Sequence, residues 1–125
     1  MYRSLAVTML CLFMACSPAS RFRKDEALFN QSKLVQRFRS ISDMNDSYFD
    51  IRENNFVEFY RQLFDSVKNT SYPGKYIQDH DTMILSFYNK EAYTFLAHKA
   101  YIDRAKKEII FFDHLPGVKK KLIFN

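Results

Sequence analysis

Both cysteines of this chain, Cys11 and Cys16, lie in its first sixteen residues. The remaining residues therefore have no disulfide, no cysteine-ligated zinc and no catalytic thiol. Any fold must come from hydrophobic burial, and 47% of the residues are hydrophobic, including 13 Phe and 8 Tyr. That content excludes a wholly disordered chain, and the length indicates a single small domain. With two glycines, glycine-rich linkers and phosphate loops are excluded as well.

Residues 1–20 have the pattern of an export signal. Arg3 provides a positive charge, residues 5–15 are mostly apolar, and the chain turns polar at Ser17. The apolar stretch is about eleven residues long, well short of the roughly twenty that a membrane-spanning helix needs. We therefore expect these residues to direct export and then to be removed.

The tetrapeptide Phe13-Met14-Ala15-Cys16 resembles the lipobox of bacterial lipoproteins. Ala15 and Cys16 match that motif, whereas Phe13 and Met14 depart from the aliphatic and small residues usual there. The resemblance implies a diacylglycerol on the Cys16 sulfur and an acyl chain on its amino group, which together give stable membrane attachment. Ser17 after the cysteine implies the outer membrane. The resemblance does not extend beyond the first seventeen residues.

This interpretation divides the chain into three parts. Residues 1–16 form a signal peptide of the lipoprotein type, residues 17–24 a tether, and residues 25–125 one globular domain. The alternative is an ordinary signal peptide cleaved after Ala19 in a secreted eukaryotic glycoprotein. Three Asn-x-Ser sequons, at Asn30, Asn45 and Asn69, support that alternative. The lack of disulfides weighs against it, because small secreted domains usually rely on them.

The spacing of apolar residues predicts a mainly α fold of about three helices. Apolar residues at helical spacing favour helices over 24–41, 51–68 and 90–107. The stripe is clearest in the second helix, which carries Phe56, Phe59, Tyr60, Leu63, Phe64 and Val67. Short polar residues predict a turn over 42–47, and Pro73 and Gly74 predict that the chain turns after the second helix.

The remaining segments leave an α+β fold open as the alternative. Residues 83–88 form a short apolar run, whose length favours a buried strand. Residues 109–112 and 122–124 form two apolar runs around a turn at Pro116 and Gly117. They predict either a short C-terminal β-hairpin or an extension of the preceding helix.

Candidate catalytic and metal-binding residues are few. His80 lies between Asp79 and Asp81, and His114 follows Asp113, so either imidazole could in principle serve as a base or a metal ligand. Adjacent side chains do not share a face of a helix or strand, however, and we expect solvated loops there. With two glycines no Gly-x-Ser-x-Gly nucleophile motif exists. We therefore predict no enzymatic activity, no catalytic residue, no metal site and no cofactor.

Charge and aromatic content suggest how the protein binds its partners. The formal net charge is +5. Basic clusters occur at residues 21–24, 37–39, 104–107 and 119–121. Export disfavours nucleic acid as a partner, whereas the cluster at 21–24 lies beside the expected anchor and suits an anionic membrane surface. The cluster at 119–121 is expected to be a solvated edge. Surplus aromatic residues predict either a contact surface that includes Tyr60, Tyr88, Tyr93 and Tyr101 or a core built of Phe in place of Leu.

Together these features predict an exported, non-enzymatic binding or accessory protein of the cell envelope. Its membrane partner is reached through lipid on Cys16, on the outer membrane or another membrane facing the periplasm, and a protein partner is expected besides. The alternative is a soluble extracellular ligand or binding protein with glycans at Asn30, Asn45 and Asn69.

Overall fold

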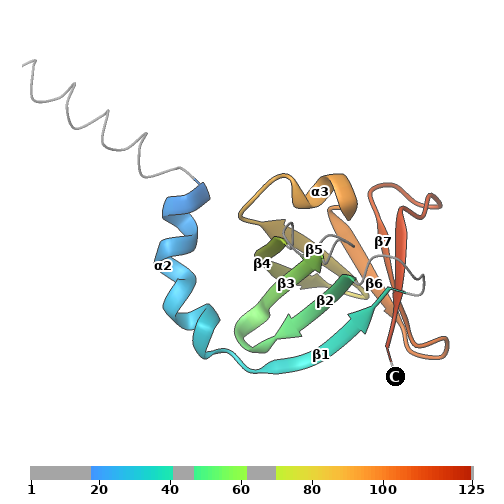
Figure 1. Cartoon of the computed structure of the whole chain (residues 1–125). Coiled ribbons are helices and arrows are strands. Elements are labelled where there is room, and N and C mark those ends of the chain that lie inside the picture. The colour runs from blue at the N-terminus through green and yellow to red at the C-terminus, as the bar shows by residue number, and fades with distance from the viewer. Residues whose placement is uncertain (1–17, 41–46, 62–69, 125) are drawn as a thin grey trace, which may run out of the picture. The chain divides into compact units, whose positions relative to one another are not determined.

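The computed structural model describes residues 18–40, 47–61 and 70–124, with side chains from residue 21 onward. The chain divides into two compact units, residues 1–31 and residues 32–125. The first contains helix α2 (Pro18–Gln31), which already begins within the residues expected to form a tether. None of the described helices is long and apolar enough to cross a membrane. The second unit is a closed barrel of antiparallel strands (Figure 1).

The barrel is an up-and-down meander in which every strand pairs with the next one along the chain. The last strand closes onto the first through the pair Arg39 and Ile123. A single turn of 3₁₀ helix, η1 (Glu53–Asn55), follows β2, and a four-residue helix, α3 (Ala92–Phe95), lies between β5 and β6. The strands are β1 (Leu34–Arg39), β2 (Ser47–Arg52), β3 (Phe56–Arg61), β4 (Thr70–Asp79), β5 (Thr82–Phe87), β6 (Lys99–Asp103), β7 (Glu108–Phe112) and β8 (Lys120–Ile123).

The predicted mainly α fold is therefore wrong, and the helix expected over 51–68 shows why. Asn54 and Asn55 both have positive φ, 61° and 62°, which breaks any helix and reverses the chain between β2 and β3. Asparagine tolerates this conformation better than most residues, so the pair is a turn signal. Val57 and Phe59 then alternate inward as a strand, with Phe59 opposite Phe49 of β2. Their spacing of two residues suits a strand, whereas the predicted helical stripe follows Phe56 and Phe59, which are three residues apart. Residues 62–69 lie outside the described part.

The other two predicted helices are wrong over much of their length. The helix expected over 90–107 is confined to α3, and β6 follows it from Lys99. Lys107, with a φ of 55°, then helps to turn the chain into β7. The helix expected over 24–41 is confirmed as far as Gln31 only, because β1 occupies the rest.

Three shorter predictions have mixed outcomes. The strand expected over 83–88 is confirmed as β5, and the C-terminal hairpin is confirmed by the pairing of Ile109 in β7 with Leu122 in β8. The turn expected at Pro73 and Gly74 is wrong, since both lie inside β4. A side chain does not fit at Gly74, where a Cβ would lie 2.8 Å from the Ser86 carbonyl oxygen. Most of the turn predicted over 42–47 lies outside the described residues.

Aromatic side chains fill the interior of the barrel. An eight-stranded barrel is just wide enough for inward side chains to fill it. Phe49 and Phe111 meet edge to face with ring centroids 5.0 Å apart, and both are fully buried. The other wholly or almost wholly buried core side chains include Phe38, Val57, Phe59, Tyr72, Leu96, Ile109 and Leu122. These side chains form the hydrophobic core of the barrel.

The two ends of the barrel differ in the length of their connections. At one end short turns join the strands, at residues 53–55, 80–81 and 104–107. At the opposite end, uppermost in Figure 1, residues 88–98 join β5 to β6 and carry α3, and residues 113–119 join β7 to β8. We call this second end the mouth of the barrel. Long connections over a rigid barrel end are a common place for binding sites.

Candidate functional site

Two cationic residues occupy inward positions at the mouth. Arg61 lies two residues after the inward Phe59 and is the last residue of β3, where it pairs with Ser47 and Thr70. Lys120 lies two residues before the fully buried Leu122 and pairs with the inward Phe111. Because side chains alternate along a strand, both basic side chains are directed to the same side as the core.

The ammonium group of Lys120 extends into the barrel opening rather than into solvent. Its Nζ lies 5.4 Å from the centroid of the Phe59 ring. Phe59 belongs to β3, which is not adjacent to β8 in the barrel, so the lysine side chain extends across the opening. Burial lowers the pKa of Lys120 below its usual value, and the positive charge of Arg61 lowers it further. The prediction that residues 119–121 form a solvated edge is therefore wrong for Lys120.

Aromatic rings hold the second cation in place. The Arg61 guanidinium carbon lies 3.5 Å from the centroid of the Phe95 ring in α3. Phe95 in turn lies against Tyr72, with ring centroids 6.2 Å apart, and Tyr72 stacks on Phe59 at the same separation. Rings from three elements therefore form the apolar floor beneath the two cations.

The hydroxyl group of Tyr72 connects this floor to a carboxylate. Burial raises the pKa of Tyr72, and the charge of Glu91 and a hydrogen bond to it raise it further, whereas Arg61 acts in the opposite direction. Tyr72 therefore stays protonated at physiological pH and donates to Glu91. Tyr72 is almost completely buried, so its orientation is fixed by packing.

The mouth has the chemistry of an anion site. Among the described residues, no ion pair joins a carboxylate to Arg61 or Lys120. Two nearby positive charges repel each other. Glu91, which accepts from the Tyr72 hydroxyl beside Arg61, offsets part of this repulsion, and a bound carboxylate or phosphate group would offset more of it. The described residues also include no group of three or more His, Cys, Asp or Glu side chains that could hold a metal ion.

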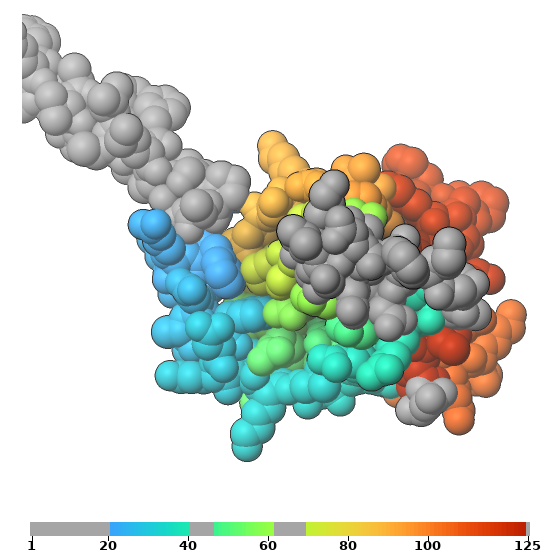
Figure 2. All heavy atoms as spheres, viewed as in Figure 1, coloured from blue at the N-terminus to red at the C-terminus, as the bar shows by residue number. Residues whose placement is uncertain are grey.

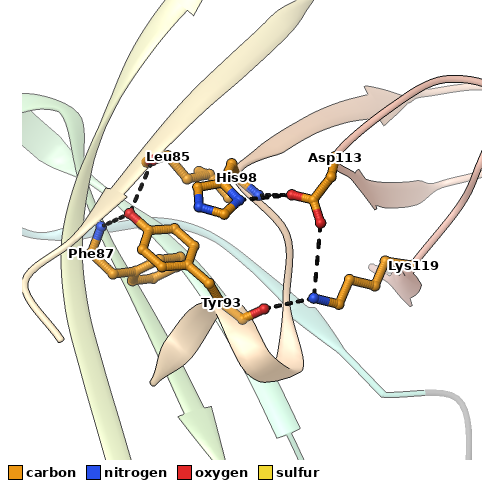
Figure 3. A network of polar contacts seen from close by, with 6 residues as sticks. All are labelled: Leu85, Phe87, Tyr93, His98, Asp113 and Lys119. Atoms are coloured by element: carbon orange, nitrogen blue, oxygen red, sulfur yellow. Dashed lines mark hydrogen bonds and ion pairs between the residues drawn. The ribbon is translucent and has the colours of Figure 1, made fainter. Parts of the chain in front are cut away.

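A second polar network fixes the loops at the mouth (Figure 3). Asp113 Oδ1 accepts a hydrogen bond from the backbone N–H of His98 at 2.9 Å. The same oxygen lies 2.8 Å from His98 Nδ1. The His98 ring stacks on Tyr93 with centroids 4.0 Å apart. The Tyr93 hydroxyl accepts from the Phe87 N–H at 2.9 Å. These contacts join the β5–β6 connection to the end of β7.

Charge supports this network at Asp113. The hydrogen bonds from His98 lower the pKa of the Asp113 carboxyl, so it remains ionised well into the acidic range. Lys119 Nζ donates to the Tyr93 carbonyl oxygen at 2.6 Å and lies 3.9 Å from Asp113 Oδ2. The contacts of the His98 backbone N–H and Nδ1 with Asp113 hold the loop in position.

The histidines singled out from the sequence are elsewhere. His80 is in the β4–β5 turn, with Nδ1 2.8 Å from Asp79 Oδ1 and a side chain that is 94% exposed. It lines an open hollow of about 690 Å³ with Asp81, Asp103 and Arg104, at the end opposite the mouth. His114 is exposed, and the structure pairs its neighbour Asp113 with His98 instead.

The remaining predicted residues are dispersed. Cys16, Asn45 and Asn69 lie outside the described residues, and Asn30 is exposed in α2. Tyr60 stacks on Tyr48 with centroids 5.2 Å apart, and Tyr93 belongs to the loop network. Tyr101 contacts Phe112. The four tyrosines expected to form one surface therefore lie in separate surroundings.

Arg61 and Lys120 were missed because no sequence motif marks them. The one available signal was alternation: Lys120 precedes Leu122 by two residues, and Arg61 follows Phe59 by two. That signal has meaning only for strands, whereas residues 51–68 are predicted as a helix and residues 119–121 as a solvated edge.

No protein-family model matches this sequence, and no significant match was found among curated proteins or solved structures.

Proposed function

We propose that this chain is an exported, non-enzymatic binding protein that captures a small anionic ligand at the mouth of its barrel. The observation that carries the proposal is the placement of Arg61 and Lys120 on inward positions of β3 and β8, above a floor of aromatic rings. The cost of partly burying a lysine is offset when an anion binds beside it.

The form of the site limits the ligand. Large buried side chains, Phe49 and Phe111 among them, point into the barrel and leave less room there for an acyl chain. A carboxylate or phosphate group on a compact molecule fits better, with its charge between the two cations and any planar apolar part against the rings.

Isothermal titration calorimetry at low ionic strength, with benzoate and with inorganic phosphate as probes, tests the anion site. We expect at least one probe to bind, and Lys120→Gln to weaken its binding about tenfold, since a charge-assisted contact contributes roughly 1.5–3 kcal/mol. Lys121→Gln is the matched control, because Lys121 is exposed on the next residue of the same strand. Equal losses in the two variants, or no binding of either probe at millimolar concentration, would contradict the proposal.

We further propose that lipid on Cys16 holds the barrel to a bacterial envelope membrane. The lipobox-like Phe13-Met14-Ala15-Cys16 supports this location. The intact mass of the mature protein tests it: acyl chains on an N-terminal Cys16 are expected. An N-terminus at Ser20 with hexose-rich additions at Asn30, Asn45 or Asn69 would instead establish the secreted glycoprotein.

A further inference from the structure

A second hollow lies outside the barrel, at the seam where β1 meets β8. Its volume is about 540 Å³, and it is lined by Arg37, Arg39, Ser40, Ile123 and Phe124. The seam forms where Arg39 pairs with Ile123. In Figure 2 the teal residues of β1 lie beside the red C-terminal residues on this side of the molecule.

Arg37 is held rigidly at the edge of this hollow. Its Nε donates to Asp50 Oδ1 at 2.8 Å and its Nη2 donates to Asp50 Oδ2 at 2.9 Å. The Asp50 side chain is only 3% exposed, so this ion pair is anchored in the barrel wall, whereas Arg37 itself is 40% exposed. The pair uses one edge of the guanidinium group and leaves the Nη1 side for another acceptor.

Arg39 is placed beside Arg37 by the same aromatic ring. The guanidinium carbons of Arg37 and Arg39 lie 4.8 Å and 5.6 Å from the centroid of Tyr48. Within the described part of the chain, no carboxylate forms an ion pair with Arg39. Asp50 pairs with Arg37, and Glu58 is close enough to act on its charge, so among the described residues the positive charge of the hollow comes from Arg39.

The hollow also has an apolar wall, which is held in place by packing against the core. Ile123 and Phe124 line it, and the Phe124 ring meets the fully buried Phe38 edge to face, with centroids 4.9 Å apart. A cationic edge facing an apolar wall suits a ligand that carries an anionic group and an apolar part on one molecule.

We propose that this seam hollow is a second binding site, for a phosphate group carried on an amphipathic molecule such as a lipid with a phosphate monoester headgroup. Arginine recognises phosphate through paired N–H donors, and Arg39 has its whole donor edge for this purpose. Ile123 and Phe124 would contact the apolar part nearest the phosphate. The inference is independent of the mouth, with which the hollow shares no lining residue.

Binding of dihexanoyl phosphatidic acid below its micelle concentration tests the site. Isothermal titration calorimetry would compare the full chain with Arg39→Gln, Arg39→Lys and the exposed control Arg104→Gln. We expect Arg39→Gln to weaken binding about tenfold, Arg39→Lys to weaken it less, and Arg104→Gln to leave it unchanged. Circular dichroism establishes that each variant is folded.

Two further titrations identify the source of the phosphate group. Dihexanoyl phosphatidylcholine should bind at least tenfold more weakly, because its headgroup is zwitterionic, and inorganic phosphate should bind more weakly because it cannot contact the apolar wall. Equal affinity for inorganic phosphate would overturn the lipid assignment. An unchanged affinity in Arg39→Gln, or a loss caused by Lys120→Gln instead, would overturn the seam site itself without affecting the proposed anion site at the mouth.

Discussion

The guanidinium group of Arg61 lies directly against the ring of Phe95, with 3.5 Å between the guanidinium carbon and the ring centroid. Phe95 belongs to the four-residue helix α3 in the connection between β5 and β6. One loop therefore positions a cation of β3 at the barrel mouth. Through this contact, the conformation of the β5–β6 connection determines where the positive charge of Arg61 lies in the candidate site.

Phe95→Leu should consequently weaken anion binding without unfolding the barrel. Leucine keeps much of the apolar contact with Tyr72 but removes the ring face that attracts Arg61, a loss of about 1 kcal/mol. That value corresponds to roughly a fivefold lower affinity by calorimetry. Leu115→Ala, at an exposed loop position, serves as the control. An affinity equal to that of the wild-type chain would show that Phe95 does not position Arg61.

The lowered pKa of Lys120 predicts opposite responses of binding and stability to alkaline pH. An anion prefers the protonated lysine, so affinity should fall as pH rises through the lowered pKa of Lys120. Stability should instead rise between that pKa and the ordinary lysine value, because the unfolded chain holds more protons there. Calorimetric titrations and urea unfolding across this range check both slopes. In Lys120→Met both contributions should disappear, and their persistence would assign them to another group.

Asp50→Asn should destabilise the barrel by about 2 kcal/mol. Asp50 is buried and accepts two hydrogen bonds from Arg37, at 2.8 Å and 2.9 Å, so the neutral amide leaves that arginine without its counter-ion. Urea unfolding at neutral pH measures the change. Asp79→Asn removes an exposed carboxylate beside His80 and should change stability by less than about 0.5 kcal/mol. Similar losses of stability in the two variants would contradict the prediction that the buried Asp50 stabilises the barrel more than the exposed Asp79 does.

Gly74→Ala should cost about 2 kcal/mol, because the added methyl group has no space between β4 and β5. Its Cβ would lie 2.8 Å from the Ser86 carbonyl oxygen and 2.9 Å from Phe87 Cδ1. Gly117→Ala is the natural comparison, since the nearest atom there is 3.1 Å away and lies in an exposed turn. Thermal unfolding followed by circular dichroism should show the larger decrease for Gly74→Ala.

Local sequence patterns were correct for two short segments. The length of the apolar run 83–88 favoured the strand that became β5, and the two runs around Pro116 predicted the β7–β8 hairpin, with an extended helix as the alternative. The clearest helical pattern, over 51–68, was wrong: Phe56 and Phe59 are three residues apart, which suits a helix face, whereas Val57 and Phe59, two residues apart, form the inward face of the strand. Asn54 and Asn55 decide for the strand, because two successive positive φ angles end any helix.

The candidate site was less predictable than the fold because it joins residues that are distant in the chain. Lys120 is flanked by Lys119 and Lys121, and the three are indistinguishable by composition. Register separates them: Lys120 pairs with the inward Phe111, whereas Lys121 pairs with Ile110 on the other face. Arg61 comes close to Lys120 only when the barrel closes, and closure requires all eight strands.

The sequence by itself therefore determined the composition of this protein: an apolar, aromatic chain that has no cysteine after Cys16. Tertiary structure alone decided which faces the basic residues occupy. Strand alternation and closure of the barrel direct Arg61 and Lys120 inward and leave Arg37 and Arg39 at the outer seam. The physical reason is that a one-residue change of register moves every side chain of a strand to the opposite face.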